Sequence, residues 1–169
     1  MVIYLLAAIA FAFLATFAYA GWQAAPWFPT RSSDIGRLLK LADVKTGQKF
    51  YDLGCGDGRI IMAAAKQGAV AEGFEISLLP YLMAQVRLAF CVNTKAAVSY
   101  KNFWNRNLSD ADIVYFFLMP KIYPKLRSKL EKELKPGTKV ISYAWPMEGW
   151  QPTAIDRSEG KLPLYLYSR

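Results

Sequence analysis

The sequence contains no histidine and only two cysteines among its 169 residues. The absence of histidine excludes Ser-His-Asp and Cys-His nucleophilic sites, and it also excludes zinc or haem sites that depend on a His ligand. Cys55 and Cys91 alone cannot form a disulfide framework or a four-thiolate metal site. We therefore expect a reducing compartment and no bound metal.

Charge is absent from residues 1–30, although the chain carries 21 Lys and Arg against 13 Asp and Glu. The run from Val2 to Ala20 is apolar except for Thr16. At 1.5 Å per residue it spans roughly 28 Å, close to the hydrocarbon core of a bilayer. We expect residues 1–21 to form a single transmembrane anchor. A cleaved signal peptide is the alternative, because Ala18-Tyr19-Ala20 has the form of a cleavage site, but the basic region that such peptides carry is missing.

The residues that follow this run suggest the orientation of the anchor. Aromatic side chains come first, as at membrane interfaces, and basic ones come next, as on the cytoplasmic side. The aromatic set is Trp22, Trp27 and Phe28, and the basic set is Arg31, Arg37 and Lys40. We therefore expect a membrane protein of single-pass topology whose remaining chain faces the cytoplasm.

After the uncharged segment, short apolar runs alternate with helical patterns. Strands are expected at 49–53, 70–76, 96–101, 112–118 and 138–145, and helices at 59–67, 77–91 and 120–134. Residues 153–156 and 162–167 flank a Ser-Glu-Gly turn and predict an antiparallel hairpin. This order predicts an α/β, Rossmann-like fold with a mostly parallel sheet and a ligand crevice at the carboxyl ends of its strands.

The first of these strands runs directly into a glycine-rich turn, Gly54-Cys55-Gly56-Asp57-Gly58. The turn lacks the Lys of a phosphate-binding P-loop, and its spacing differs from the dinucleotide fingerprint. Asp52 stands at the strand end, and Glu75 closes the next strand. Because a carboxylate there can accept both hydroxyls of a ribose, the pattern predicts a nucleoside ligand without a pyrophosphate.

Residues 50–59 together with Glu75 resemble motif I and its acidic partner in class I S-adenosylmethionine-dependent methyltransferases. The resemblance extends over about residues 27–155 to the small protein lysine methyltransferases, which are the archaeal broad-specificity enzymes and the mitochondrial ATP synthase c-subunit lysine methyltransferases. The segments that carry it are Phe28-Pro29-Thr30, 52–60, Gly73-Phe74-Glu75, Asn102-Phe103-Trp104, Met119-Pro120 and Trp150-Gln151-Pro152. The chain departs from the family at Asn102, where an acid is common, and at Leu118-Met119, where Gly-Val is common.

The resemblance implies S-adenosyl-L-methionine as the cofactor. It divides the chain into the anchor (1–21), a linker and cofactor-closing segment (22–36) and a methyltransferase domain (37–169). The cofactor-binding residues that it implies are Pro29, Thr30, Asp52, Gly54, Cys55, Gly56, Asp57, Gly58, Glu75, Ile76, Asn102, Phe103 and Leu118. A nucleophilic role for Cys55 is disfavoured because no base accompanies it.

The implied reaction is methyl transfer to lysine side chains of a protein. A membrane-embedded substrate protein would suit the anchor. An apolar channel would lower the pKa of the lysine without a histidine. We expect Met119, Pro120 and Trp150 to line the acceptor pocket, with Trp145 and Pro146 as further candidates. The alternatives are methylation of a lipid headgroup or small amine, or a non-catalytic cofactor-binding protein. No nucleic-acid partner is expected, since an Asn/Asp-Pro-Pro-Tyr motif is absent after the fourth strand.

Overall fold

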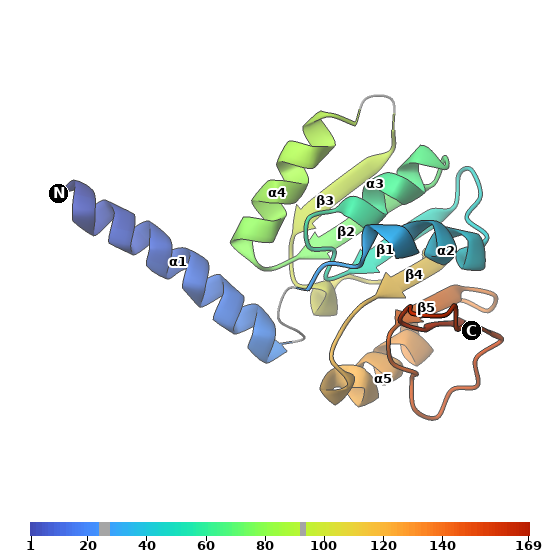
Figure 1. Cartoon of the computed structure of the whole chain (residues 1–169). Helices are drawn as coiled ribbons and strands as arrows, with labels where there is room; N and C mark the ends of the chain where they lie inside the picture. The colour runs from blue at the N-terminus through green and yellow to red at the C-terminus, as the bar shows by residue number, and fades with distance from the viewer. Residues whose placement is uncertain (24–27, 92–93) are drawn as a thin grey trace.

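The computed structural model describes residues 1–23, 28–91 and 94–169. Trp27, expected at the membrane interface, lies outside the described residues, and the side chain of Trp22 is not described either. The described chain forms one helix that stands apart and one domain built around a sheet (Figure 1).

The sheet has seven strands in the order β3-β2-β1-β4-β5-β7-β6. The first five strands in the chain are parallel, and β7 pairs antiparallel with both β5 and β6, which confirms the expected fold class and hairpin. The strands are β1 (Lys49–Leu53), β2 (Val70–Glu75), β3 (Ala96–Tyr100), β4 (Ile113–Phe116), β5 (Lys139–Tyr143), β6 (Ala154–Asp156) and β7 (Leu164–Ser168). The direction of winding reverses between β1 and β4, so a ligand crevice is expected at their carboxyl ends.

Helices cover both faces of the sheet. On one face α2 (Ser32–Ala42), α3 (Arg59–Lys66) and α4 (Leu78–Ala89) pack on strand residues such as Phe50 and Ile113. On the other face α5 (Tyr123–Glu133) packs on Tyr51 and Val114. Successive residues of a strand point to opposite faces, so the continuous apolar run of β4 is buried on both sides.

One helix end agrees with the sequence-based expectation, and two helix boundaries differ from it. Gly68 has φ +90° just after α3, as expected for a left-handed helix cap. The helix expected at 120–134 is divided into a 3-10 turn, Pro120–Ile122, and α5. α2 begins inside the segment 22–36 that the sequence suggested as a linker, and its buried Leu38 and Leu39 belong to the core.

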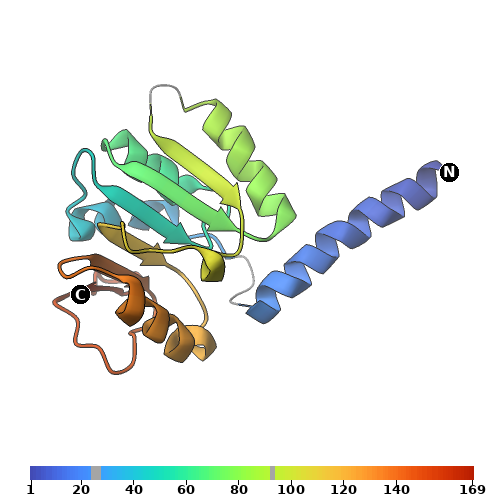
Figure 2. The ribbon, with the colours of Figure 1, turned by 180° about the vertical axis from the view of Figure 1, so that it is seen from behind.

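α1 (Val2–Gln23) extends away from the domain (Figures 1 and 2). Its segment Val2–Gly21 has a mean hydropathy of 2.2 and is long and apolar enough to cross a membrane. The contacts between its last turns and the domain include two hydrogen bonds. Thr16 Oγ1 accepts the backbone N–H of Leu78 at 3.2 Å, and Lys121 Nζ donates to the carbonyl oxygen of Gly21 at 2.9 Å.

Candidate active site

The glycine-rich turn between β1 and α3 has a backbone that only glycine adopts readily. Gly54, Gly56 and Gly58 have φ values of +85°, +55° and +73°. A Cβ atom on Gly54 would lie 3.2 Å from the Leu118 side chain, and one on Gly58 would lie 3.2 Å from Ala84. The turn is held to β2 because the N–H groups of Gly54 and Cys55 both donate to the Phe74 carbonyl oxygen. The backbone is thereby fixed as the floor of a crevice.

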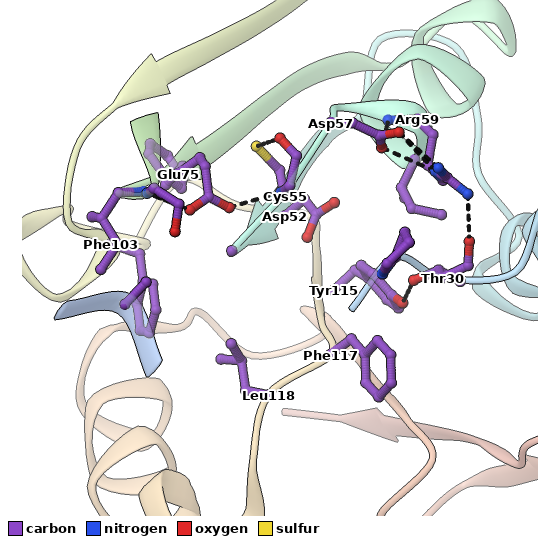
Figure 3. A pocket seen from close by; sticks show the side chains of 18 of the residues that line it. Thr30, Asp52, Cys55, Asp57, Arg59, Glu75, Phe103, Tyr115, Phe117 and Leu118 are labelled. Carbon is purple, nitrogen blue, oxygen red and sulfur yellow. Dashed lines mark hydrogen bonds and ion pairs between the residues drawn. The ribbon is translucent and has the colours of Figure 1, made fainter. Parts of the chain in front are cut away.

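This crevice encloses about 700 Å³, including space open to solvent, at the carboxyl ends of β1, β2 and β4 (Figure 3). Eleven of the thirteen predicted cofactor-binding residues line it: Pro29, Thr30, Asp52, Gly54, Cys55, Gly56, Asp57, Glu75, Ile76, Phe103 and Leu118. Gly58 and Asn102 are not among the lining residues. The last turn of α1 also reaches the crevice through Ala20.

The Glu75 carboxylate is held rigidly at the end of β2. One oxygen accepts the N–H groups of Ile76 and Ser77 at 2.8 and 2.7 Å, and the other accepts the N–H of Gly56 at 2.9 Å. Glu75 is 7% exposed. The three amide donors fix the position of the carboxylate, and its oxygens keep lone pairs that can accept hydroxyl groups from the crevice.

Asp52 carries a buried polar atom whose partner is missing. Among the described residues none donates to its Oδ1, and the side chain is 2% exposed. Burial raises the pKa of Asp52 well above its usual range, and the nearby Glu75 and Asp57 carboxylates raise it further. A cation bound in the crevice would complete this site.

Asp57 connects the glycine-rich turn to the segment before α2. Its Oδ2 lies 2.7 Å from Arg59 Nη2 and 2.8 Å from Arg87 Nη2. Although burial acts against ionisation, the two cations hold the pKa of Asp57 below its ordinary value. Arg59 Nη1 also donates to the Thr30 carbonyl oxygen at 3.0 Å, and Thr30 Oγ1 lies 2.7 Å from Tyr115 Oη. Residues 29–30 are thus tethered over the crevice from two sides.

Cys55 has no nucleophilic character in this structure. The residue is 6% exposed, and burial raises the pKa of its thiol well above the ordinary value. A Cβ atom on Gly73 of β2 would lie 2.6 Å from Cys55 Sγ, so the thiol fills space against the neighbouring strand. Its role at the crevice is packing.

Asn102 serves a local backbone role. Its Oδ1 accepts the N–H of Trp104 at 3.1 Å and so caps the 3-10 turn Phe103–Asn105. The residue lines a separate shallow groove beside α1 instead of the crevice. Phe103, the next residue, does line the crevice, and its ring packs on Trp104 with a centroid separation of 4.7 Å.

A second, apolar compartment of about 810 Å³ adjoins the crevice, again including open space. Phe28, Phe117 and Leu118 belong to both. The Phe117 ring stacks on Trp145 at 5.7 Å and meets Phe28 edge-on at 6.1 Å. The remaining lining residues are Met119, Ala144, Trp145 and Leu162. We name this space the aromatic compartment.

Only one of the three predicted acceptor-pocket residues, Met119, lines the aromatic compartment. Pro120 is exposed at the start of a 3-10 turn and is not among the lining residues. Trp150 packs on Tyr167 at 5.6 Å and donates from Nε1 to Glu131 Oε1 of α5, and it is not among the residues that line the aromatic compartment. The sequence analysis missed Phe117, Tyr115 and Arg59 as site residues, although the run of aromatic residues at the end of β4 was a signal for the first two.

Comparison with known proteins decides the family. The family model described as "ANTKMT methyltransferase domain" matches residues 52–154. A protein-lysine N-methyltransferase of Saccharolobus islandicus is 38% identical over 153 residues, which cover 84% of this chain and 92% of that protein. The chain belongs to the ANTKMT methyltransferase family. It is an S-adenosylmethionine-dependent methyltransferase.

Further relatives of this methyltransferase differ in length and in the acceptor that their names state. The adenine nucleotide translocase lysine N-methyltransferase of mouse is 36% identical over 77% of this chain and 57% of that protein. The chain therefore spans just over half the length of this animal relative. The crystal structure of an RNA methyltransferase from Salinibacter ruber in complex with S-adenosyl-L-homocysteine matches with a TM-score of 0.78 and 32% identity, over 83% of this chain and 93% of that one.

The residues of the crevice fit S-adenosylmethionine. The glycine-rich turn gives a close backbone approach, Glu75 offers fixed acceptors, and the unpartnered Asp52 Oδ1 offers an anion for the ammonium or sulfonium charge. Phe103 lines the same crevice with an aromatic ring.

Proposed function

We propose that this methyltransferase modifies the ε-amine of lysine side chains in a protein. The observation that carries the proposal is the aromatic compartment, which joins the cofactor crevice at Phe117 and Leu118. A lysine has a four-carbon stem that suits apolar and aromatic walls, with a terminal amine that must reach the methyl group. The names of the archaeal and animal relatives, which are protein-lysine methyltransferases, support this acceptor.

The aromatic compartment promotes the reaction through its low polarity. A lysine ammonium has no lone pair, so it must first release a proton to water. Apolar walls such as Phe117 and Trp145 disfavour the charged form and lower the pKa of the amine. S-Adenosylmethionine, when bound, supplies a methyl group on a positively charged sulfur; the amine lone pair forms the new N–C bond as the S–C bond breaks. Alignment of the two substrates can supply about 7 to 11 kcal/mol of the barrier.

The cofactor-binding roles follow the same geometry. We propose that Glu75 accepts the ribose hydroxyls, that Asp52 receives the positive charge near the methionine part, and that Phe103 covers the adenine. Thr30, tethered to Arg59 and Tyr115, closes the crevice over the bound cofactor. Asn102 caps a 3-10 turn and is not assigned a contact with the base.

To identify the acceptor, the full chain is incubated with a membrane proteome and with S-adenosylmethionine that carries a labelled methyl group. Protein, lipid and RNA are then extracted separately, and the label in each extract is measured. Label in protein that is lost when lysines are chemically blocked beforehand supports the proposal. Label in the lipid extract or in RNA contradicts it. Trp145 lines the aromatic compartment and is not among the residues that line the crevice, so Trp145→Ala should reduce transfer much more than it weakens binding of S-adenosylhomocysteine. Cofactor binding without any transfer would indicate a non-catalytic protein.

We also propose that residues 2–21 anchor the enzyme in a membrane with the catalytic domain on the cytoplasmic side. The length and apolarity of α1 and the basic residues that follow it support this location. Carbonate extraction of cell membranes should leave the full chain in the membrane fraction, and protease added to the cytoplasmic side should digest the domain. A mature protein that begins after Ala20 would show instead that the segment is a cleaved signal peptide.

A further inference from the structure

The outer face of α4 is apolar along the whole helix. Five side chains on it are exposed by 37% to 81%: Leu79, Leu82, Met83, Val86 and Phe90, the last of which follows the helix directly. Leu79, Leu82, Val86 and Phe90 are three or four residues apart, with Met83 beside Leu82, and the five therefore form one stripe. A continuous exposed stripe of this kind marks an interaction surface more often than it marks ordinary solvent-facing surface.

The polar side chains of α4 bond to the rest of the domain. Gln85 Nε2 donates to the Val98 carbonyl oxygen of β3 at 2.9 Å. Apart from Tyr81, whose ring lies against Tyr100, the other polar side chain of α4 is Arg87, whose Nη2 lies 2.8 Å from Asp57 Oδ2. Arg87 is 41% exposed and lines a surface groove with Leu82, Met83 and Val86, so one cation borders the stripe. A basic side chain beside an apolar face is typical of helices that lie in a membrane surface.

The position of α4 relative to α1 identifies what covers the stripe. The two helices are in contact, and the N–H of Leu78 at the start of α4 donates to Thr16 Oγ1 of α1. In Figures 1 and 2, α4 runs across the direction of α1 and forms the side of the domain nearest the N-terminal half of α1. If α1 crosses a bilayer, α4 therefore lies along its surface.

The depth of this contact also agrees with a surface helix. Thr16 precedes Gly21, the end of the apolar segment, by five residues, and five residues of helix measure about 7.5 Å. Helices that lie in the plane of a membrane bury their apolar face about 5 to 10 Å below the boundary between headgroups and acyl chains. The contact with α1 thus places α4 at the depth that an interfacial helix occupies.

We infer that the exposed stripe of α4 lies in the surface of the bilayer that α1 crosses, so that the domain contacts lipid as well as being tethered to it. This inference rests on the proposed anchoring through α1. The membrane contact holds the domain in one orientation, with α5, on the opposite face of the sheet, turned toward water.

The test uses the full chain in vesicles of phosphatidylcholine with a minor fraction of phosphatidylglycerol. In a Cys91→Ser background, Val86→Cys on the stripe carries a fluorescent label, and Lys132→Cys, exposed on α5, is the matched control. Cys55 is buried and does not compete for the label. Unchanged binding of S-adenosylhomocysteine shows that each labelled chain is folded.

The label at 86 should be quenched by nitroxide-bearing lipids and should be several-fold less accessible to iodide than the label at 132. Equal accessibility of both positions, in chains that float with the vesicles, would overturn the inference and leave the anchoring intact. The inference would also be overturned if nitroxide-bearing lipids did not quench the label at 86 and if this label stayed protected from iodide in detergent. That result would indicate contact between copies of the chain. Failure of the chain to float with vesicles would refute the anchoring, and the inference with it.

Discussion

Arg59 binds Thr30 and Asp57 at the same time, with Nη1 donating to the Thr30 carbonyl oxygen at 3.0 Å and Nη2 lying 2.7 Å from Asp57 Oδ2. The glycine-rich turn is thereby connected to a segment 29 residues earlier in the chain. One guanidinium group makes the position of residues 29–30 depend on the conformation of the cofactor-binding turn. This dependence can be tested, because Arg87 contacts the same carboxylate without contacting Thr30.

The first prediction compares Arg59→Met with Arg87→Met. Each change removes one cation from the buried Asp57, so each should lower the free energy of unfolding by about 1.5 to 3 kcal/mol. Only Arg59→Met also releases Thr30, and it should therefore weaken binding of S-adenosylhomocysteine several-fold more than Arg87→Met does. Calorimetry and chemical denaturation measure the two effects. Equal affinities in the two variants would show that the tether has no part in cofactor binding.

The second prediction concerns Asp52→Asn. Removal of the anion that faces the cofactor should weaken binding about ten- to hundred-fold, as for loss of a hydrogen bond to a charged group. Since burial raises the pKa of Asp52, the free chain tends to hold a proton there that a bound cation displaces. The affinity of the wild-type chain should therefore rise as the pH increases, whereas the affinity of Asp52→Asn should not.

The same raised pKa has a consequence for stability. Above the ordinary Asp value of 3.8, the unfolded chain loses its proton while the folded chain keeps it, so Asp52 destabilises the fold increasingly as pH rises. Asp52→Asn removes this penalty and should make the cofactor-free chain at least as stable as wild type at neutral pH. A large loss of stability would mean that Asp52 has a structural partner.

The third prediction separates Met119 from Trp150, two residues that the sequence placed together. Met119→Ala should lower kcat/KM for the acceptor, because Met119 lines the aromatic compartment. Trp150→Ala should leave kcat/KM nearly unchanged and lower the free energy of unfolding by about 1 to 3 kcal/mol, since it removes the contacts with Tyr167 and Glu131. Steady-state kinetics and denaturation of both variants provide the comparison. A kinetic defect confined to Trp150→Ala would contradict the proposed location of the acceptor site and indicate that it lies near Trp150.

The fourth prediction concerns alkaline stability. Burial raises the pKa of Tyr123 to about 12, and its hydroxyl lies 3.0 Å from Ser142 Oγ. The unfolded chain ionises near pH 10 and the folded chain does not, so this residue should lower the free energy of unfolding by up to about 2 to 3 kcal/mol as pH rises from 10 to 12. Tyr123→Phe should be less stable than wild type at pH 8 but should lose less stability above pH 10. Identical pH slopes would contradict the assignment.

The sequence predicted the sheet and the cofactor crevice because both depend on local patterns. The glycines, Asp52 and Glu75 lie at the ends of adjacent strands, and strand ends meet at one edge of a parallel sheet. No helix was expected over the range of α2, and its first five residues were assigned to the linker because they follow the uncharged segment closely. Asn102 Oδ1 accepts a nearby backbone N–H, which is the usual competing role of asparagine, and the assignment of Asn102 to the base stays a prediction.

The lining of the aromatic compartment could be predicted only in part because it depends on the path of a loop. Ala144, the residue after β5, has φ +75°, a positive value that is uncommon for residues other than glycine. The next residue, Trp145, then stacks on Phe117, while the following turn carries Trp150 toward Tyr167. The sequence does not reveal that the chain turns between these two tryptophans, so Trp145 and Trp150 were interpreted as sharing one site.

Phe117 lies between the crevice and the aromatic compartment, together with Phe28 and Leu118, so a molecule on one side of its ring can change the wall that faces the other side. A molecule that enters first and shifts this ring alters the surface that the second molecule meets. The two substrates of the enzyme are therefore expected to bind interdependently, with the affinity for each changing when the other is present.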